Sequence, residues 1–428
     1  MASDPSVNAK TTPLPEAEAA SVGFAAERLA RMDRAMQAEI DAGHYAGISV
    51  MVARHGKLVK SARYGFQSLE TRAPLREDAI FRIASMTKPM VAVAMLTLYE
   101  EGKWQLDDPV TKFLPEFADL KVMNADGGLV PLDRPMLMRH VMSTSAGFAF
   151  GPLLGSVNPK VDALYAAADL WSGTNDDLIA KLAKLPLEAQ PGTHFRYGLQ
   201  QEVQGAIIKR LTGQTIDVVL EQRVFAPLGL KDTGFGVAPD SRDRIAPRYE
   251  LDETLKLVLA QDQSPFPTVA GTPPGVTPKF LLSIAGLYST AQDYLRFAQM
   301  LANGGELDSA RILSPSSVKL MTSNLLADGV PMRFLQSFDG VGYGMNVGVV
   351  LDPARASFNG GAVGKGTFYW GGVHGTWFWV DPVNDVVVVG MLQQVDGGNP
   401  MTGRPYPVAD VRAISRSITY GALVYPAL

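Results

Sequence analysis

Residues 80–104, IFRIASMTKPMVAVAMLTLYEEGKW, form the segment that decides the fold. The first five residues are strand-like, and the run from Met86 to Glu101 is apolar and helix-forming, so Ser85 stands where a strand passes into a helix. Pro89 falls in the first turn of that helix, where its missing N–H does no harm. Gly102 follows the last helical residue, as a C-terminal capping glycine does. The segment therefore predicts a long apolar helix with a serine at its beginning.

Ser85 and Lys88 form an S-x-x-K pair at the beginning of this helix. Residues three apart share one helix face, so the Lys88 ammonium can reach back to the Ser85 hydroxyl. The helix N-terminus favours negative charge on a serine alkoxide, and an apolar setting lowers the pKa of a lysine, as serine activation requires. The segment alone equally allows a structural role, in which Ser85 caps the helix and Lys88 is solvated.

A second S-x-x-K pair, Ser316 and Lys319, indicates how little the pattern decides by itself. Ser314 and Pro315 read as an N-cap and a first helical residue, so this pair is predicted to lie on an ordinary surface helix. The G-x-S-x-G elbow of α/β-hydrolases does not occur in the sequence, which disfavours a Ser-His-Asp enzyme of that type.

The rest of the chain alternates between helical and strand-like patterns. The predicted helices cover residues 25–41, 172–185, 200–212 and 291–304, and the predicted strands cover residues 47–54, 58–64, 343–351, 367–370, 376–380 and 386–392. We expect the N-terminal hairpin and the C-terminal strands to share one antiparallel sheet. The helical middle is then inserted as a second lobe, with a cleft where the lobes meet.

This arrangement predicts three parts of the chain. Residues 1–22 form a flexible N-terminal lead, residues 23–90 and 285–428 form a discontinuous α/β domain, and residues 91–284 form a helical domain. The proline-rich segment 264–278 is expected to be an irregular loop that walls a pocket.

Composition narrows the function classes. The chain of 428 residues is 46% hydrophobic and 19% charged, and its net charge of −4 comes without a basic run, so nucleic-acid binding is not expected. Cysteine is absent, which excludes disulfides, thiolate nucleophiles and Cys-ligated metals. The five histidines include no i,i+4 pair, so neither a metal nor a cofactor is predicted. No apolar window is long enough to span a membrane, and residues 1–20 lack the core of a secretory signal, so a cytoplasmic location is expected.

The motifs taken together resemble the class C β-lactamase superfamily. Besides residues 83–89 (IASMTKP), the resemblance rests on residues 101–110 (EGKWQLDDPV), 138–148 (MRHVMSTSAGF) and 286–291 (GLYSTA), and it extends from about Phe24 to the C-terminus. Within that superfamily the chain is most similar to the family VIII carboxylesterases. The resemblance implies an α/β (α+β) fold with an antiparallel sheet flanked by helices and an all-helical lobe, which agrees with the arrangement predicted from the pattern.

The resemblance also implies which residues carry the chemistry. Ser85 and Lys88 are its first motif, and the second, Y-x-N, corresponds to Tyr197-Gly198-Leu199, with leucine in place of asparagine. The third, K-T-G, corresponds to Trp370-Gly371-Gly372, where the cation is lost and the glycines remain.

On this resemblance Ser85, Lys88 and Tyr197 are catalytic. Tyr197, with a pKa lowered by the positive charge of Lys88, accepts the Ser85 proton while Ser85 attacks an acyl carbonyl. Whether lysine or tyrosine is the formal base stays open. The oxyanion is held by the backbone N–H groups of Ser85 and Val373, and the glycines before Val373 let the strand approach the substrate closely.

Substrate binding is assigned to Trp370, Gly371, Gly372 and Leu199. In β-lactamases the asparagine amide and the lysine ammonium of these motifs bind the substrate's amide side chain and carboxylate. Leu199 can do neither, and Trp370 offers one N–H donor and a large apolar face. The expected substrate is therefore a neutral small-molecule ester, and the predicted function is a carboxylesterase for short-chain esters.

Other interpretations stay open at this point. The same fold would serve a β-lactamase, a D-aminopeptidase, an amidase or an acyltransferase, and a non-catalytic penicillin-recognising binder is an alternative from a different class. His374 and His194 lie close to the motifs, but structural or surface roles are favoured because serine, lysine and tyrosine already cover proton transfer. The oligomeric state does not follow from the sequence.

Overall fold

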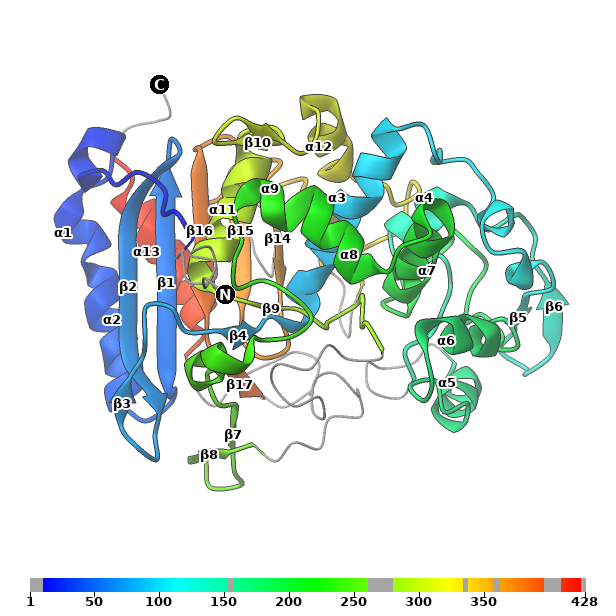
Figure 1. The fold of residues 1–428 in the computed structure, drawn as a ribbon, viewed down its shortest axis with the longest axis horizontal. Coiled ribbons are helices and arrows are strands. Elements are labelled where there is room, and N and C mark those ends of the chain that lie inside the picture. Colours follow the sequence, from blue (N-terminus) through cyan, green and yellow to red (C-terminus); the bar gives the residue numbers. More distant parts are fainter. Residues whose placement is uncertain are drawn as a thin grey trace, which may run out of the picture.

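The computed structural model describes residues 11–151, 158–260, 280–333, 338–356, 362–395 and 409–424. An antiparallel sheet occupies one side of the molecule and a group of helices the other (Figure 1). Its eight described strands follow the order β12-β13-β14-β15-β16-β1-β2-β3, so the N-terminal hairpin lies beside the C-terminal strands, as predicted. Their bounds are β1 Gly47–Arg54, β2 Lys57–Ser68, β3 Ala73–Pro74, β12 Val341–Tyr343, β13 Gly348–Val350, β14 Phe368–Gly371, β15 Trp377–Asp381 and β16 Val386–Met391.

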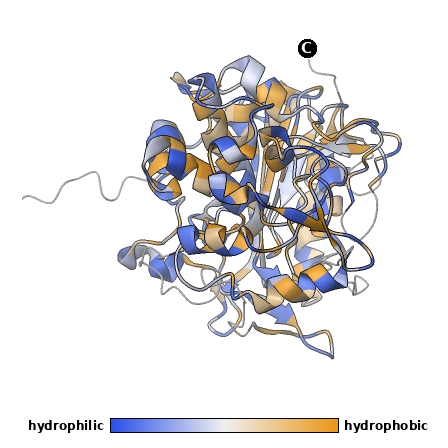
Figure 2. Cartoon of the chain, turned by 90° about the vertical axis from the view of Figure 1, so that its right-hand side faces the viewer, coloured by the Kyte–Doolittle hydropathy of each residue, from blue (hydrophilic) through white to orange (hydrophobic). Residues whose placement is uncertain are grey.

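The centre of the sheet is buried on both faces. β1 and β16 are rich in valine, which suits a pleated and tightly packed surface, and they pair in register with Val52 opposite Val388. Helix α11 (Ala291–Ala302) packs on β1, β15 and β16, while α2 (Arg31–Asp41) packs on β2 and on α13 (Val411–Ala422). Hydrophobic and hydrophilic residues both occur around the helices in Figure 2, as expected where one helix face meets a core.

The helical part begins with α3 (Thr87–Glu100), which packs against α7 (Gln200–Thr212). Both helices end as predicted, with Gly102 and Gly213 in the left-handed conformation at φ 71°. The other described helices of this part are α4 Met138–Met142, α5 Pro159–Ala167, α6 Asn175–Leu182, α8 Ile216–Leu220 and α9 Ala226–Leu228, with a π-helical turn at Glu221–Phe225 between the last two.

Small elements complete the fold. The pair β4 (Phe81–Arg82) and β9 (Tyr288–Ser289) holds the chain just before Ser85. The remaining described strands are β5 Lys121–Met123, β6 Leu129–Pro131, β7 Tyr249–Leu251, β8 Leu257–Leu259, β10 Glu306–Leu307, β11 Ala310–Arg311 and β17 Gln394–Val395; the remaining described α-helices are α1 Ala26–Leu29 and α12 Pro315–Met321.

Three predictions about local structure are wrong in part. The strand predicted over residues 343–351 is a hairpin of β12 and β13, because the chain turns at Asn346, whose φ is 60°. The helix predicted over residues 25–41 is divided at Ala30 into α1 and α2. The helix predicted over residues 172–185 is the shorter α6, whose N-cap is Thr174.

The lead predicted over residues 1–22 is packed against the body of the protein from residue 11 onward. Leu14 is 2% exposed, and the N–H of Ala17 donates to the carbonyl of Leu58 at 2.9 Å. The prediction of a flexible lead is therefore wrong for residues 11–22. The boundaries predicted at residues 90/91 and 284/285 stay predictions. Among the described helices, none combines the length and apolar character that crossing a bilayer requires.

Candidate active site

Ser85 lies in a tight turn between the β4–β9 pair and α3. The N–H of Ile83 donates to the carbonyl of Leu287 at 3.1 Å, and a 3₁₀ turn over Ala84–Met86 leads directly into the helix. Ala84 has a φ of 45°, a left-handed value that is uncommon for a residue with a Cβ. Such backbone strain persists where the surroundings hold a turn in place, and it often occurs at functional sites.

Lys88 lies in the first turn of α3 and is completely buried. Its Nζ donates to the carbonyl of Ile284 at 2.8 Å and lies 4.5 Å from the centroid of the Tyr197 ring. The sequence predicted that this ammonium reaches back to the Ser85 hydroxyl, but no hydrogen bond joins the two residues in the described structure. Burial lowers the pKa of Lys88 well below its usual value, while the negative charge of Glu202 acts in the opposite direction.

Tyr197 contacts Ser85 directly. Its hydroxyl and the Ser85 Oγ are 2.7 Å apart, and its ring is buried. Burial raises the pKa of Tyr197, and the hydrogen bonds with Ser85 and Trp370 only partly offset that rise. The expectation that the positive charge of Lys88 lowers the Tyr197 pKa is therefore wrong, because the cost of burying a phenolate sets the direction of the shift.

A glycine fixes the approach of the Tyr197 segment to its neighbours. A Cβ at Gly198 would lie 1.9 Å from the carbonyl oxygen of Phe148. Only a residue without a side chain allows this close approach of two backbones, so Gly198 determines where Tyr197 stands.

The Trp370-Gly371-Gly372 segment also lies beside Tyr197. The Trp370 ring stacks on Tyr197 at a centroid distance of 6.1 Å and an interplanar angle of 20°. A Cβ at Gly372 would lie 2.5 Å from the carbonyl oxygen of Ile83, and Thr376 Oγ1 donates to that same oxygen at 3.2 Å. The turn that contains Val373 is thus held against the segment that carries Ser85. In the described part of the chain, the Val373 N–H donates no hydrogen bond.

Leu199 is buried, whereas its predicted role in substrate binding requires an exposed side chain. It is the N-cap residue of α7, and its side chain has no exposed surface. In this structure it packs in the hydrophobic core and offers no surface to a substrate, so the assignment of Leu199 to the substrate-binding wall is corrected.

The histidines beside the motifs have the environments of structural or surface residues. His374 is 2% exposed, and burial, followed by the charges of Arg248 and Arg82, lowers its pKa to about 3. It is therefore a neutral, buried imidazole at ordinary pH. His194 is exposed, with its Nδ1 2.8 Å from the Thr193 hydroxyl.

The second S-x-x-K pair has the predicted surface position. Ser314 caps α12, and its side chain accepts the N–H of Ser317 at 3.1 Å. Ser316 and Lys319 are both exposed.

Glu202 and Ile284 also contact the Lys88 neighbourhood, although none of the motifs includes them. Glu202 is 2% exposed, and its Oε1 accepts the N–H of Ile284 at 2.9 Å. The sequence carried a weak signal for Glu202, which stands in the first turn of the helix that follows Tyr197.

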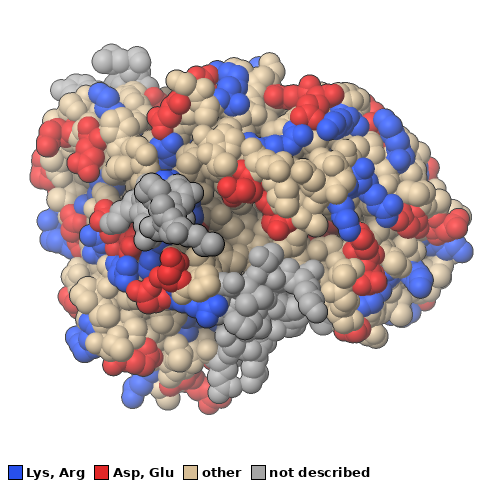
Figure 3. All heavy atoms as spheres, in the orientation of Figure 1, with Lys and Arg blue, Asp and Glu red and all other residues tan. Residues whose placement is uncertain are grey.

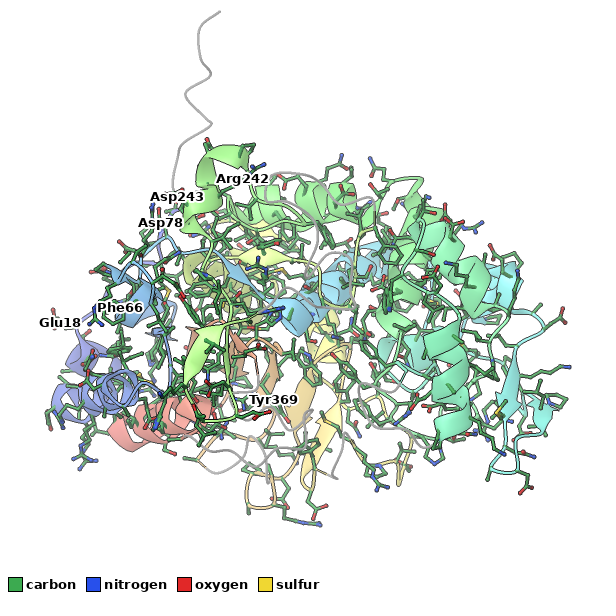
Figure 4. All side chains as sticks on the ribbon, turned by 90° about the horizontal axis from the view of Figure 1, so that it is seen from below. Glu18, Phe66, Asp78, Arg242, Asp243 and Tyr369 are labelled. Carbon is green, nitrogen blue, oxygen red and sulfur yellow. The ribbon has the colours of Figure 1, made fainter. Side chains whose placement is uncertain are left out.

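The surface seen in Figure 3 is hollowed near its middle, over the region where β4, β9 and the beginning of α3 lie in Figure 1. In β14, the strand that carries Trp370, the neighbouring residue is Tyr369, labelled in Figure 4. Adjacent strand residues point to opposite faces of the sheet, so Tyr369 faces away from Trp370.

The loop predicted over residues 264–278 lies outside the described residues. Among the described side chains, no group of three or more His, Asp or Glu residues could hold a metal ion.

Comparison with known proteins places the chain in a family. A model of the β-lactamase family matches residues 32–413. The chain belongs to this family and is a serine hydrolase, as the motifs at Ser85 and Tyr197 predicted.

Individual relatives show where the chain stands within the family. The chain is 36% identical over 379 residues to protein Rv1367c of Mycobacterium tuberculosis, an alignment covering 85% of this chain and 91% of the relative. It is 32% identical over 367 residues to the esterase EstB of Burkholderia gladioli, covering 83% and 88% of the two chains. The solved structure of EstCE1, a hydrolase with promiscuous acyltransferase activity, superposes with a TM-score of 0.74 at 27% identity, covering 92% of this chain and 99% of that one. These relatives support the predicted likeness to family VIII carboxylesterases within the class C β-lactamase and penicillin-binding protein superfamily.

Proposed function

We propose that this protein is a carboxylesterase that hydrolyses short-chain esters through an acyl-enzyme on Ser85. The observation that carries the proposal is the 2.7 Å contact between Ser85 Oγ and the Tyr197 hydroxyl, with the buried Lys88 Nζ over the face of the same ring. A nucleophile within hydrogen-bond reach of a base, with a third group beside that base, is the arrangement that covalent catalysis needs.

Proton transfer runs through Tyr197 and Lys88. As Ser85 Oγ bonds to the acyl carbon, its proton passes to the Tyr197 oxygen while the phenolic proton of Tyr197 passes to the neutral Lys88 amine, which becomes an ammonium. Burial favours a neutral phenol and a neutral amine before attack, because it raises the pKa of Tyr197 and lowers that of Lys88. The pair therefore begins in a form that can accept a proton, and Tyr197 returns it to the departing alcohol.

The oxyanion forms between two backbone N–H groups. Ser85 lies in the 3₁₀ turn that leads into α3, and the Val373 turn is held against Ile83 by the close packing of Gly372. The N–H groups of Ser85 and Val373 are the donors for the negative oxygen of the tetrahedral intermediate. Donors fixed in advance at this position lower the activation free energy by several kcal/mol, about 3–4 kcal/mol for each donor in other acyl-transfer enzymes.

The aromatic wall favours a neutral substrate. Trp370, which corresponds to the lysine of the K-T-G motif, stacks on Tyr197, and the Phe150 ring centroid lies 6.2 Å from that of Tyr197. Apolar faces of this kind bind an acyl chain or an alcohol group, whereas a carboxylate would lose its hydration without gaining an ion pair. The similarity to the esterase EstB supports the same choice.

An acyl-chain series tests this substrate assignment. With p-nitrophenyl esters from acetate to decanoate, we expect kcat/KM to be highest for the short chains and to fall by at least tenfold for decanoate. A chromogenic cephalosporin should be hydrolysed far more slowly than the best ester. Faster turnover of the cephalosporin would replace the esterase proposal with a β-lactamase.

Acyl transfer to an alcohol is the second candidate. EstCE1, with its described promiscuous acyltransferase activity, superposes on nearly the whole chain. Adding methanol or butanol to the ester assay and measuring the new ester by chromatography separates the two outcomes, because hydrolysis converts the acyl group into the free acid and transfer converts it into the new ester.

A further inference from the structure

Glu202 is a buried acidic residue that the proposed reaction does not yet use. It lies in the first turn of α7 and is 2% exposed, while Lys88 on α3 has no exposed surface. The two helices pack side by side, as Figure 1 shows. Burying a carboxylate is costly unless a charge or hydrogen bonds compensate it, so this position demands a compensating group.

The two side chains are connected through one residue. Glu202 Oε1 accepts the N–H of Ile284 at 2.9 Å, and Lys88 Nζ donates to the carbonyl of Ile284 at 2.8 Å. Ile284 is itself buried, so the two charged groups fix its backbone from both sides. The second carboxylate oxygen, Oε2, is also buried and has no hydrogen-bond partner in the described structure.

Each of the two groups affects the protonation of the other. Burial raises the pKa of Glu202, and the N–H groups of Ile284 and Ser283 and the charge of Lys88 act in the opposite direction. Burial lowers the pKa of Lys88, and the charge of Glu202 raises it again. Within the described residues, Lys88 is the one charged group that shifts Glu202, and Glu202 is the one that shifts Lys88. The carboxylate also stands at a helix N-terminus, which favours its negative charge.

We infer that Glu202 is a positioning residue for catalysis: its carboxylate fixes Ile284 and Lys88 and stabilises the ammonium that Lys88 becomes when it takes up the Ser85 proton. This inference rests on the proposed acyl-enzyme function. Glu202 touches neither Ser85 nor Tyr197 by any described hydrogen bond, so it acts through Lys88.

The role has a direct consequence for the reaction. A lysine in an apolar site without a counterion is a poor base, because its ammonium form is not solvated. The Glu202 carboxylate makes Lys88 more basic without exposing it to water. Acylation benefits because a stronger base lowers the cost of removing the Ser85 proton during attack.

Glu202→Gln tests the inference while keeping the shape of the side chain. The glutamine oxygen can still accept the N–H of Ile284, so mainly the charge is lost. The acid limb of the kcat/KM profile, which reports deprotonation of the base, should move to lower pH by about one unit or more, the size of shift produced by an opposite charge at close range. The plateau for p-nitrophenyl butyrate should fall by about 10- to 100-fold.

A matched control separates charge from packing. Asp293→Asn removes another buried carboxylate, which accepts hydrogen bonds from Thr233 Oγ1 and from the Asp232 N–H. We expect it to lower the melting temperature without moving the acid limb. If Glu202→Gln does not fold, Glu202→Asp retains the charge on a shorter side chain and should give a smaller shift in the same direction.

The outcomes distinguish this inference from the proposed function. If Ser85→Ala keeps wild-type esterase activity, the proposed function itself fails. If Ser85→Ala is inactive but folded Glu202 variants show the wild-type acid limb, the acyl-enzyme stands and the role of Glu202 is refuted. A lower plateau with an unmoved limb likewise reduces Glu202 to a packing residue.

Discussion

Tyr197→Phe removes one oxygen atom from the centre of the proposed mechanism. The phenylalanine ring keeps the stacking on Trp370, at 6.1 Å between centroids, and the face over which Lys88 lies. What is lost is the hydroxyl 2.7 Å from Ser85 Oγ, and with it the route by which the proton leaves the nucleophile.

The size of the effect follows from that loss. General acid–base catalysis by a positioned side chain contributes about 10²- to 10⁴-fold, or about 3–5 kcal/mol of activation free energy at about 1.4 kcal/mol per decade. We therefore expect kcat/KM for p-nitrophenyl butyrate to fall by that factor. The folded state should lose only about 1 kcal/mol, the typical value of one hydrogen bond.

The assay compares initial rates at equal concentrations of folded enzyme, with folding checked by circular dichroism. Tyr343→Phe is the matched control, since Tyr343 is buried and packs edge-on against Trp370 at 5.2 Å but makes no described hydrogen bond with Ser85. A Tyr197→Phe enzyme within about threefold of wild type would remove the tyrosine from the mechanism, and an equal loss in both variants would attribute the effect to general packing.

Three further predictions concern residues around the site. Gly372→Ala places a Cβ 2.5 Å from the Ile83 carbonyl oxygen, so esterase kcat/KM and the melting temperature should both fall. A Cβ added by Gly371→Ala has no neighbour closer than 3.2 Å, so this control variant should change both quantities little, and equal effects of the two variants would contradict the packing argument. Leu199→Asn buries an amide in the core, so it should lower the free energy of unfolding in denaturant by about 2–4 kcal/mol and should not create cephalosporin hydrolysis. A stable variant with new β-lactamase activity would refute the buried position of Leu199. The unfolded chain protonates His374 near pH 6.5 and the folded chain only near pH 3, so this residue contributes stability above pH 6.5 that is lost as the pH falls toward 3. His374→Asn should remove up to about 1.4 kcal/mol per pH unit of that acid-induced loss, and an unchanged slope of unfolding free energy against pH would contradict the buried neutral state.

Local patterns predicted much of the fold. The helix after Ser85 and its glycine end followed from an unbroken apolar run and from the conformational freedom of Gly102, and β1 and β16 followed from β-branched runs bounded by turns. The hairpin of β12 and β13 was missed because the apolar residues Met345 and Val347 continue through its turn, in which Asn346 has the left-handed conformation.

Only those site residues that belong to a motif could be predicted from the sequence. Ser85 contacts Tyr197 and Lys88 lies over the Tyr197 ring, which agrees with the grouping that the family resemblance implied, but the direction of the Tyr197 pKa shift does not agree with it. Burial of that ring depends on Trp370, which lies far away in the sequence, so no local pattern reports it. The same is true of Glu202, whose connection to Lys88 passes through Ile284.

The most direct test of the central claim is to observe the acyl-enzyme itself. Wild-type protein mixed with p-nitrophenyl butyrate and quenched in acid within milliseconds to seconds should gain the mass of one butyryl group, and peptide mapping should place that group on Ser85. The Tyr197→Phe protein should acylate more slowly, and Ser85→Ala should not acylate at all. A butyryl group on another residue, or ester turnover by Ser85→Ala at the wild-type rate, would contradict the account.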